Sequence, residues 1–177
     1  MATSLEQTVA ACKKHDFKAQ RAFYNLFYRM VYNTCCRMLS NAMDAEECMQ
    51  DAFVKAFGKF HAIGDAPPEA WLKRIAINTC LDALKAKHPD WTETDETLYI
   101  VNEPPPDEET MNWKVEQVKA AMEQLPEKYR IILSLYLMEG YDHEEIAEIL
   151  QLNEATARSQ YSRAKQKLIE IIKKVEI

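Results

Sequence analysis

Residues 143–168 read HEEIAEILQLNEATARSQYSRAKQKL, and this stretch decides the fold of the C-terminal part of the chain. Its first apolar residues repeat at helical spacing and predict a short helix from His143 to Leu150. Gln151, Leu152 and Asn153 predict a tight turn, and a longer helix follows from Glu154. A short helix, a tight turn and a longer basic helix are typical of a helix-turn-helix, whose second helix can enter the major groove of DNA.

The outward positions of this second helix carry side chains suited to nucleic acid. Arginine can bind guanine through two hydrogen bonds, glutamine can pair with adenine, and serine, threonine and lysine suit phosphates. The candidate DNA-binding residues are Thr156, Arg158, Ser159, Gln160, Arg163 and Lys167. Ala157, Tyr161, Ala164 and Leu168 are expected to form the inward stripe. An ordinary solvated helix in a helical hairpin has the same pattern, so both interpretations stay open at this point.

The rest of the chain also predicts helices, so the expected fold class is all-α. The sequence of 177 residues has only 3 glycines, whereas folds with many short strands need glycine at their turns. Apolar periodicity predicts helices over 17–40, 44–60, 69–87 and 115–125, and a further helix from Pro126 towards Gly140. Asp44 with Glu47, and Asp142 with Glu145, have the spacing of helix capping boxes. The first three helices are expected to form a compact bundle that buries Phe23, Leu26, Phe27, Phe53, Trp71, Leu72, Ile75 and Leu84, among others.

Charge divides the chain into three parts. Residues 1–88 hold 12 basic and 9 acidic residues, a net charge of +3, and residues 113–177 hold 10 basic and 11 acidic residues, a net charge of −1. Residues 89–112 hold 8 acidic residues, no Lys or Arg, and three consecutive prolines. Such a composition is typical of an extended spacer, although a surface loop within one domain fits it too. The sequence predicts an N-terminal domain (1–88), an acidic linker (89–112) and a C-terminal domain (113–177).

Several function classes lack their sequence signals. The longest nearly apolar run covers residues 131–138, far short of the roughly 20 residues of a membrane span. No secretory signal is visible at the N-terminus, and the 5 cysteines form no C-x-x-C pair, as expected of free thiols in the cytoplasm. The 4 histidines have no metal-site spacing, and no phosphate-binding glycine loop occurs. We therefore expect no catalytic site, no metal and no cofactor.

Three stretches together resemble one family. LPEKYRIILSLYLMEGYDHEEIAEILQLNEATARSQYSRAKQKL (125–168) resembles the C-terminal promoter-binding domain of bacterial extracytoplasmic-function sigma factors. DAEECMQDAFVKAF (44–57) resembles the polymerase-binding helix of their first domain, and WLKRIAINTCLDALK (71–85) resembles the helix that follows it. The three matches occur in the order that the family has, with an acidic linker between the second and the third.

The resemblance implies roles for particular residues. It implies contacts to the largest polymerase subunit for Asp44, Glu46, Glu47, Gln50, Asp51 and Phe53. It also implies that the loop 60–68 and Asn78 hold unstacked bases of the −10 element, while Lys73, Arg74 and Lys85 contact phosphates. The six candidates on the last helix would contact the −35 element. Without the resemblance, capping is the preferred explanation for Asp44 and Glu47, and Asn78 could be a structural mid-helix residue.

The chain departs from the family pattern at a few positions. Gln151 stands where the family usually has glycine, Ala157 and Tyr161 replace the usual Val and Leu, and Gln160 replaces a common basic residue. Lys85 replaces a common arginine. These changes bear on the −35 preference and not on the presence of the motif.

The resemblance implies core RNA polymerase and promoter DNA as partners, together with an anti-sigma factor. Two other functions fit the same residues. A stand-alone helix-turn-helix regulator would bind an operator without polymerase, and a sigma-like interaction module would bind polymerase or an anti-sigma factor without opening promoters. The expected function is a sigma factor that is not itself an enzyme, does not insert into a membrane and acts in the cytoplasm.

Overall fold

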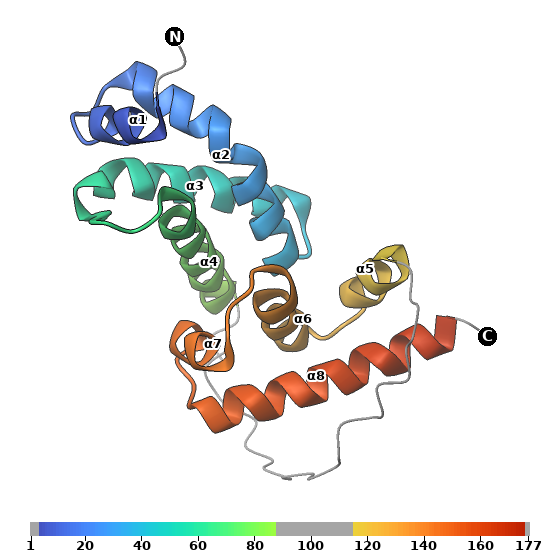
Figure 1. The fold of residues 1–177 in the computed structure, drawn as a ribbon. Coiled ribbons are helices and arrows are strands. Elements are labelled where there is room, and N and C mark those ends of the chain that lie inside the picture. The colour runs from blue at the N-terminus through green and yellow to red at the C-terminus, as the bar shows by residue number, and fades with distance from the viewer. Residues whose placement is uncertain (1–3, 88–114, 176–177) are drawn as a thin grey trace. The chain divides into compact units, whose positions relative to one another are not determined.

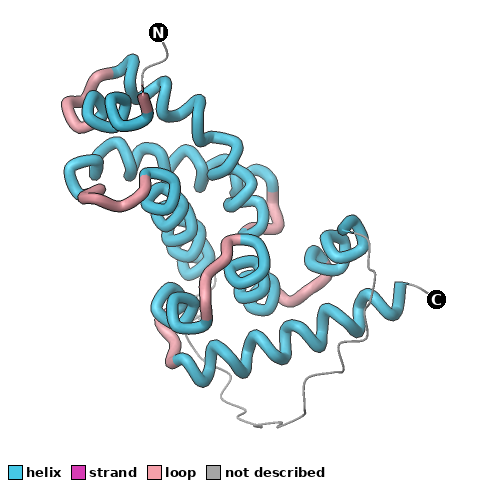
Figure 2. Tube along the Cα trace, viewed as in Figure 1, coloured by secondary structure: helices cyan, strands magenta, loops and turns pink. Residues whose placement is uncertain are grey.

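The structure, a computed structural model, describes residues 4–87 and 115–175. Within these ranges every regular element is a helix, as expected for the all-α class. The chain divides into two compact units, one within Met1–Glu93 and the other within Thr94–Ile177 (Figures 1 and 2). The predicted linker 89–112 lies outside the described residues, so its limits stay a prediction. None of the described helices combines the length and the apolar character that crossing a membrane requires.

The first unit is a bundle in which α2, α3 and α4 each pack against the other two (Figure 1). Its helices are α1 (Leu5–Cys12), α2 (Phe17–Met38), α3 (Ala42–Lys59), η1 (Phe60–Ala62) and α4 (Pro68–Lys87). Aromatic rings fill the centre: the Phe23 ring meets Phe60 edge-on, with centroids 5.0 Å apart, and Phe53 packs on Tyr24 at 4.7 Å. Pro68 occupies the first position of α4, where the missing proline N–H costs no helical hydrogen bond.

Most of the expected core is buried, with exceptions that long-range packing explains. Leu26 is 60% exposed, so it lies outside the contacts that α2 makes within the described part of this bundle. Trp71 and Ile75 are only half-buried, whereas Ile77 is fully buried. The side of α4 turned to α2 and α3 is therefore wider than a single apolar stripe, and it also takes in Thr79 and Cys80.

The start of α3 differs from the prediction. Asn41 caps this helix, because its side-chain oxygen accepts a hydrogen bond from the Met43 N–H at 2.9 Å. The predicted capping box of Asp44 and Glu47 is therefore wrong: both residues already lie inside the helix. Asp44 instead binds Lys87 at the end of α4, with 2.5 Å between carboxylate and ammonium.

The second unit is built around its last helix. Its elements are α5 (Val115–Glu123), α6 (Glu127–Leu133), the π-helical turn η3 (Ser134–Met138), α7 (His143–Leu150) and α8 (Glu154–Val175). Helix α8 packs against α5, α6 and α7, as Figure 1 shows. Ala157, Ala164 and Leu168 lie on its buried side, as expected, and Tyr161 is half-buried. Gly140, with φ of +80°, lies in the left-handed region that favours glycine where the chain turns from η3 to α7.

Candidate functional site

Helix α7, a three-residue turn and helix α8 form the predicted helix-turn-helix. Asp142 and Glu145 make the predicted capping box at the start of α7: each side chain accepts a hydrogen bond from the other's N–H, at 2.8 and 2.9 Å. The Leu152 N–H then donates to the Ala147 carbonyl at 2.8 Å and closes the turn. The Asn153 side chain caps α8 by accepting a hydrogen bond from the Thr156 N–H at 2.7 Å.

The turn contains a strained residue. Gln151 has φ of 58° and ψ of 42°, a left-handed conformation that costs a residue with a Cβ roughly 1–2 kcal/mol. Glycine adopts this conformation without that cost. The chain therefore keeps the turn geometry even though glutamine stands at its left-handed position.

Three rings fix how α8 packs near its start. Tyr161 lies 4.5 Å from Tyr136 and 5.0 Å from His143, and the Tyr136 and His143 rings stack at 4.8 Å, all between ring centroids. Burial raises the pKa of the Tyr161 hydroxyl, and Tyr136 raises it further. These contacts join α8 to both η3 and α7, so the tyrosine that departs from the family pattern serves as a packing residue.

The six predicted −35 residues all lie on α8, and none of them is buried. At about 100° of rotation per residue, Ser159 and Arg163 lie opposite the buried side, while Arg158 and Gln160 lie on the two edges of the exposed face. Arg158 donates to Glu154 Oε1 through Nε at 2.9 Å and through a terminal nitrogen at 2.5 Å. Lys167 pairs with Glu170 at 3.0 Å. Glu154, for which no sequence pattern predicts a role, therefore orients a candidate DNA-binding arginine.

The first unit presents an acidic surface on α3, formed by Glu46, Glu47, Gln50 and Asp51. All four side chains are exposed, and their spacing places them on one side of the helix. Asp44 is less available, because it is half-buried and bound to Lys87. Phe53 is 2% exposed and packs in the core, so its assignment as a polymerase-contacting residue is wrong.

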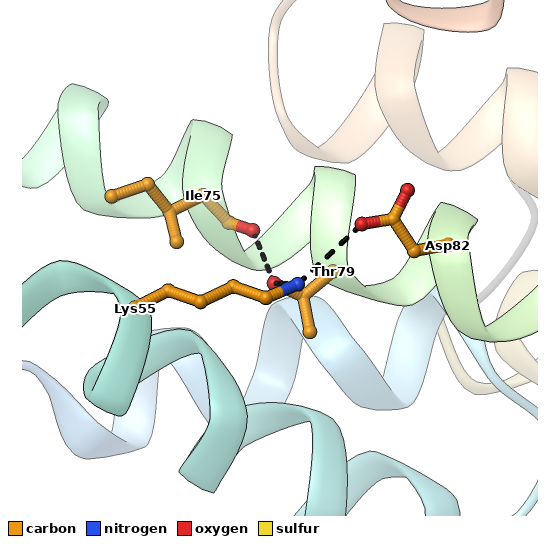
Figure 3. A network of polar contacts seen from close by, with 4 residues as sticks. All are labelled: Lys55, Ile75, Thr79 and Asp82. Atoms are coloured by element: carbon orange, nitrogen blue, oxygen red, sulfur yellow. Dashed lines mark hydrogen bonds and ion pairs between the residues drawn. The ribbon is translucent and has the colours of Figure 1, made fainter.

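A polar clamp joins α3 to α4 beside this surface (Figure 3). Lys55 Nζ of α3 donates to Thr79 Oγ1 at 3.2 Å and lies 3.4 Å from the Asp82 carboxylate, both on α4. The Thr79 hydroxyl donates in turn to the Ile75 carbonyl at 2.8 Å. Together with the pair of Lys87 and Asp44, whose hydrogen bond raises the pKa of Lys87, the clamp fixes α4 against α3 near both ends of their contact.

The predicted −10 residues of α4 do not all share one row. Arg74, Asn78 and Lys85 lie within about 40° of one another around the helix axis, whereas Lys73 is about a third of a turn away. Asn78 is exposed, and the three cations are half-exposed. The preceding loop is anchored at Phe60 and Ile63, which are 2% and 3% exposed. Within the described residues, no group of His, Cys, Asp and Glu side chains could hold a metal ion.

Comparison with known proteins gives the family. Residues 23–88 match the model of Sigma-70 region 2, and residues 115–168 match the model of Sigma-70, region 4. The chain is 25% identical to the ECF RNA polymerase sigma factor SigW of Bacillus subtilis, covering 95% of this chain and 96% of that protein. It is 29% identical to the RNA polymerase sigma-H factor of Pseudomonas aeruginosa, with 91% and 90% covered.

Solved structures show the same fold. The sigma factor RpoE of Bartonella quintana, in complex with the anti-sigma factor NepR, matches with a TM-score of 0.60 and 22% identity over 86% of this chain and 96% of that one. CnrH, in complex with the cytosolic domain of CnrY, matches with a TM-score of 0.56 and 18% identity, covering 94% of this chain and 95% of that one. The chain belongs to the sigma-70 family, in its extracytoplasmic-function group.

Proposed function

We propose that this chain is a sigma factor, a subunit that binds core RNA polymerase and directs it to promoters. The observation that carries the proposal is the presence, in one chain and in the family's order, of a region 2 and a region 4. The polymerase supplies the chemistry of RNA synthesis, so the chain needs no catalytic site of its own. Because polymerase and promoter DNA are its targets, it acts in the cytoplasm.

The proposed division of labour follows the surfaces already described. The acidic surface of α3 contacts basic helices of the polymerase, because exposed carboxylates attract such helices and steer their approach. Arg74, Asn78 and Lys85 of α4 contact the −10 element with the loop before them, and Lys73 supplies a further phosphate contact from a different side of the helix. On α8, the face centred on Ser159 and Arg163 contacts the −35 element.

Regulation by an anti-sigma factor is part of the proposal. Two relatives of the same fold were solved with such a partner or with the cytosolic domain of another protein. An inhibitor of this chain would have to cover the acidic surface of α3, the exposed face of α8, or both, because these are the surfaces with which we expect the chain to bind its targets.

Transcription in vitro tests the function. Purified protein and core RNA polymerase are combined on a library of genomic promoter fragments, and the 5′ ends of the transcripts are sequenced. We expect discrete start sites that core polymerase alone does not produce, preceded by two shared sequence motifs. Binding to core without transcripts would indicate a sigma-like interaction module, and specific DNA binding without core binding would indicate a stand-alone regulator.

A charge reversal tests the polymerase surface within the same assay. Asp51→Arg should weaken core binding, because it places a cation where we expect basic helices of the polymerase, while the isolated protein should keep its helical content by circular dichroism. Glu6→Arg is the matched control: it makes the same charge change on α1, at another exposed position of the same unit. Equal core binding by the two variants would contradict the assignment of the α3 surface.

A further inference from the structure

Three cysteine thiols from three different helices meet inside the first unit. Cys35 of α2, Cys48 of α3 and Cys80 of α4 are 0%, 5% and 0% exposed. The Cys80 thiol lies between the other two and is in hydrogen-bond contact with both. Small apolar residues would fill these positions equally well, and neither polymerase binding nor promoter binding uses a thiol. The cluster therefore has a chemistry that the proposed function leaves unexplained.

The chain provides its own comparison thiols. Cys36 follows Cys35 on α2 but is exposed, with Tyr32 as its hydrogen-bond partner. Cys12 is buried in α1, where burial first and Asp16 second raise the pKa of its thiol to about 11. A high pKa keeps a thiol protonated and unreactive, since the thiolate is the nucleophile. The three-thiol cluster differs from both in holding thiols against one another.

We propose that Cys48 and Cys80 form a reversible disulfide site, oxidised by a small peroxide. Cys48 has the only exposure in the cluster and attacks first, and Cys80 resolves the product because it is already in contact with the Cys48 sulfur. The inference concerns the core of the first unit and does not depend on sigma activity.

The asymmetry of the two thiols supports this order of events. The hydrogen bond from Cys80 lowers the pKa of Cys48, and this effect outweighs burial and the carboxylates of Asp51, Glu47 and Asp44, which raise it. The same contacts, together with burial, hold the pKa of Cys80 far above the ordinary value of a thiol. Of the two thiols, Cys48 is therefore the one assigned the first attack, and Cys80 the one that gives up its proton in the second step.

The reaction balances with hydrogen peroxide as the oxidant. The Cys48 thiolate attacks one peroxide oxygen, an S–O bond forms, the O–O bond breaks, and hydroxide leaves with the electron pair. The Cys80 sulfur then attacks the sulfenic sulfur of Cys48, the S–O bond breaks, and the leaving oxygen departs as water, taking up the proton that Cys80 gives up. Two thiols lose two electrons and two protons in all, and the peroxide is reduced to two waters. An added dithiol returns both cysteines to the reduced form by exchange.

The location gives the bond a structural consequence. A disulfide has an S–S distance of about 2.05 Å, so the two sulfurs must draw closer than hydrogen-bond contact. Cys48 and Cys80 lie on the two helices that the Lys55 and Lys87 contacts already join, and a close-packed interior passes such a shift to its neighbours. Oxidation would thus add a covalent link to the contact between α3 and α4.

Peptide mapping of the full-length protein tests the proposal. The reduced protein is treated with hydrogen peroxide, its remaining thiols are alkylated under denaturing conditions, and the digest is analysed by mass spectrometry. We expect a peptide pair joined through Cys48 and Cys80, 2 Da lighter than the two reduced peptides together, which disappears after dithiothreitol. The yield should fall at least tenfold when the same protein is treated while unfolded in urea, because unfolding removes the contact.

Variants separate the proposal from other thiol chemistry. Cys36→Ala should leave the joined pair unchanged, whereas Cys80→Ala should abolish it and make Cys48 less readily oxidised, because the hydrogen bond that lowers the pKa of its thiol is lost. Alanine is chosen because a buried serine hydroxyl would lack a partner. Wild-type protein in which only Cys36 is oxidised, or in which Cys35 and not Cys48 is joined to Cys80, would overturn the proposal without any variant having to fold.

Discussion

The exposed face of α8 carries the proposed DNA contacts, which substitutions of single residues can test. Arg163 lies opposite the buried side, and Arg158 lies on one edge, held by Glu154. We expect Arg163→Ala and Arg158→Ala each to weaken binding of a −35 promoter fragment by the holoenzyme by about 1–3 kcal/mol, the range for arginines that touch bases. Affinity measured by fluorescence anisotropy checks this, with core binding unchanged.

A lysine far from the helix-turn-helix provides a control for the loss of one positive charge. Lys174 is exposed in the last turn of α8, so Lys174→Ala removes the same charge from the same helix, far from the helix-turn-helix. Its effect on promoter affinity should be well under half that of Arg163→Ala. If all three variants lost affinity equally, the contacts would be diffuse charge attraction to phosphates and the proposed face would be wrong.

The left-handed residue Gln151 gives a prediction about stability. Gln151→Gly removes the Cβ at φ of 58°, while Gln151→Ala removes the same polar side chain and keeps the Cβ. The difference between the two variants isolates the backbone strain, and we expect glycine to be more stable than alanine by about 1 kcal/mol. Urea unfolding followed by circular dichroism measures it. Alanine equal to glycine would mean that the turn relaxes when the side chain is lost.

At the scale of elements, short sequence patterns correctly predicted a helix cap and a turn that form between residues close together in the chain. The capping box at Asp142, the limits of α7 and the turn after it follow from residues a few positions apart, and the structure has all of them. The clamp of Lys55 on Thr79 joins residues 24 positions apart, and the pair of Asp44 and Lys87 spans 43. No periodicity marks such pairs, which is why Asp44 was assigned to a cap. The apolar pattern placed Phe53 on the buried side of its helix, where the structure has it, and only the resemblance suggested a polymerase contact there.

The clamp between α3 and α4 can be measured through the Thr79 hydroxyl. Thr79 is 4% exposed, and its hydroxyl accepts from Lys55 and donates to Ile75. Thr79→Val keeps the shape and removes both hydrogen bonds, so we expect the free energy of unfolding to fall by about 1–2 kcal/mol. In a Lys55→Met background, where one of these bonds is already absent, Thr79→Val should lower the free energy of unfolding by less. An equal loss in both backgrounds would show that Lys55 contributes nothing to the clamp.

At the scale of the molecule, charge explains why the free chain should bind DNA weakly. The net charge is −6, yet residues 155–177 alone hold 6 basic and 2 acidic residues. Affinity for DNA comes largely from neutralising phosphates, and each unit offers only a small cationic surface. Promoter binding must therefore draw on both units together with the polymerase. On this proposal, the predicted linker 89–112 matters chiefly because it keeps the two units on one chain.

Cutting that segment tests the role of the connection. A protease site inserted within 89–112 leaves both units intact, and cleavage changes only whether they are tethered. Tethering raises the effective concentration of the second unit to about the millimolar range, which can raise overall affinity by roughly 10²–10⁴-fold. At nanomolar concentrations we expect the cut protein to support at least tenfold less promoter-specific transcription than protein with a scrambled, uncut site. Raising the cut protein to micromolar concentrations should restore part of the activity, because cleavage lowers only the effective concentration of the second unit. Cut protein that is fully active at nanomolar concentrations would mean that each unit binds the polymerase tightly by itself.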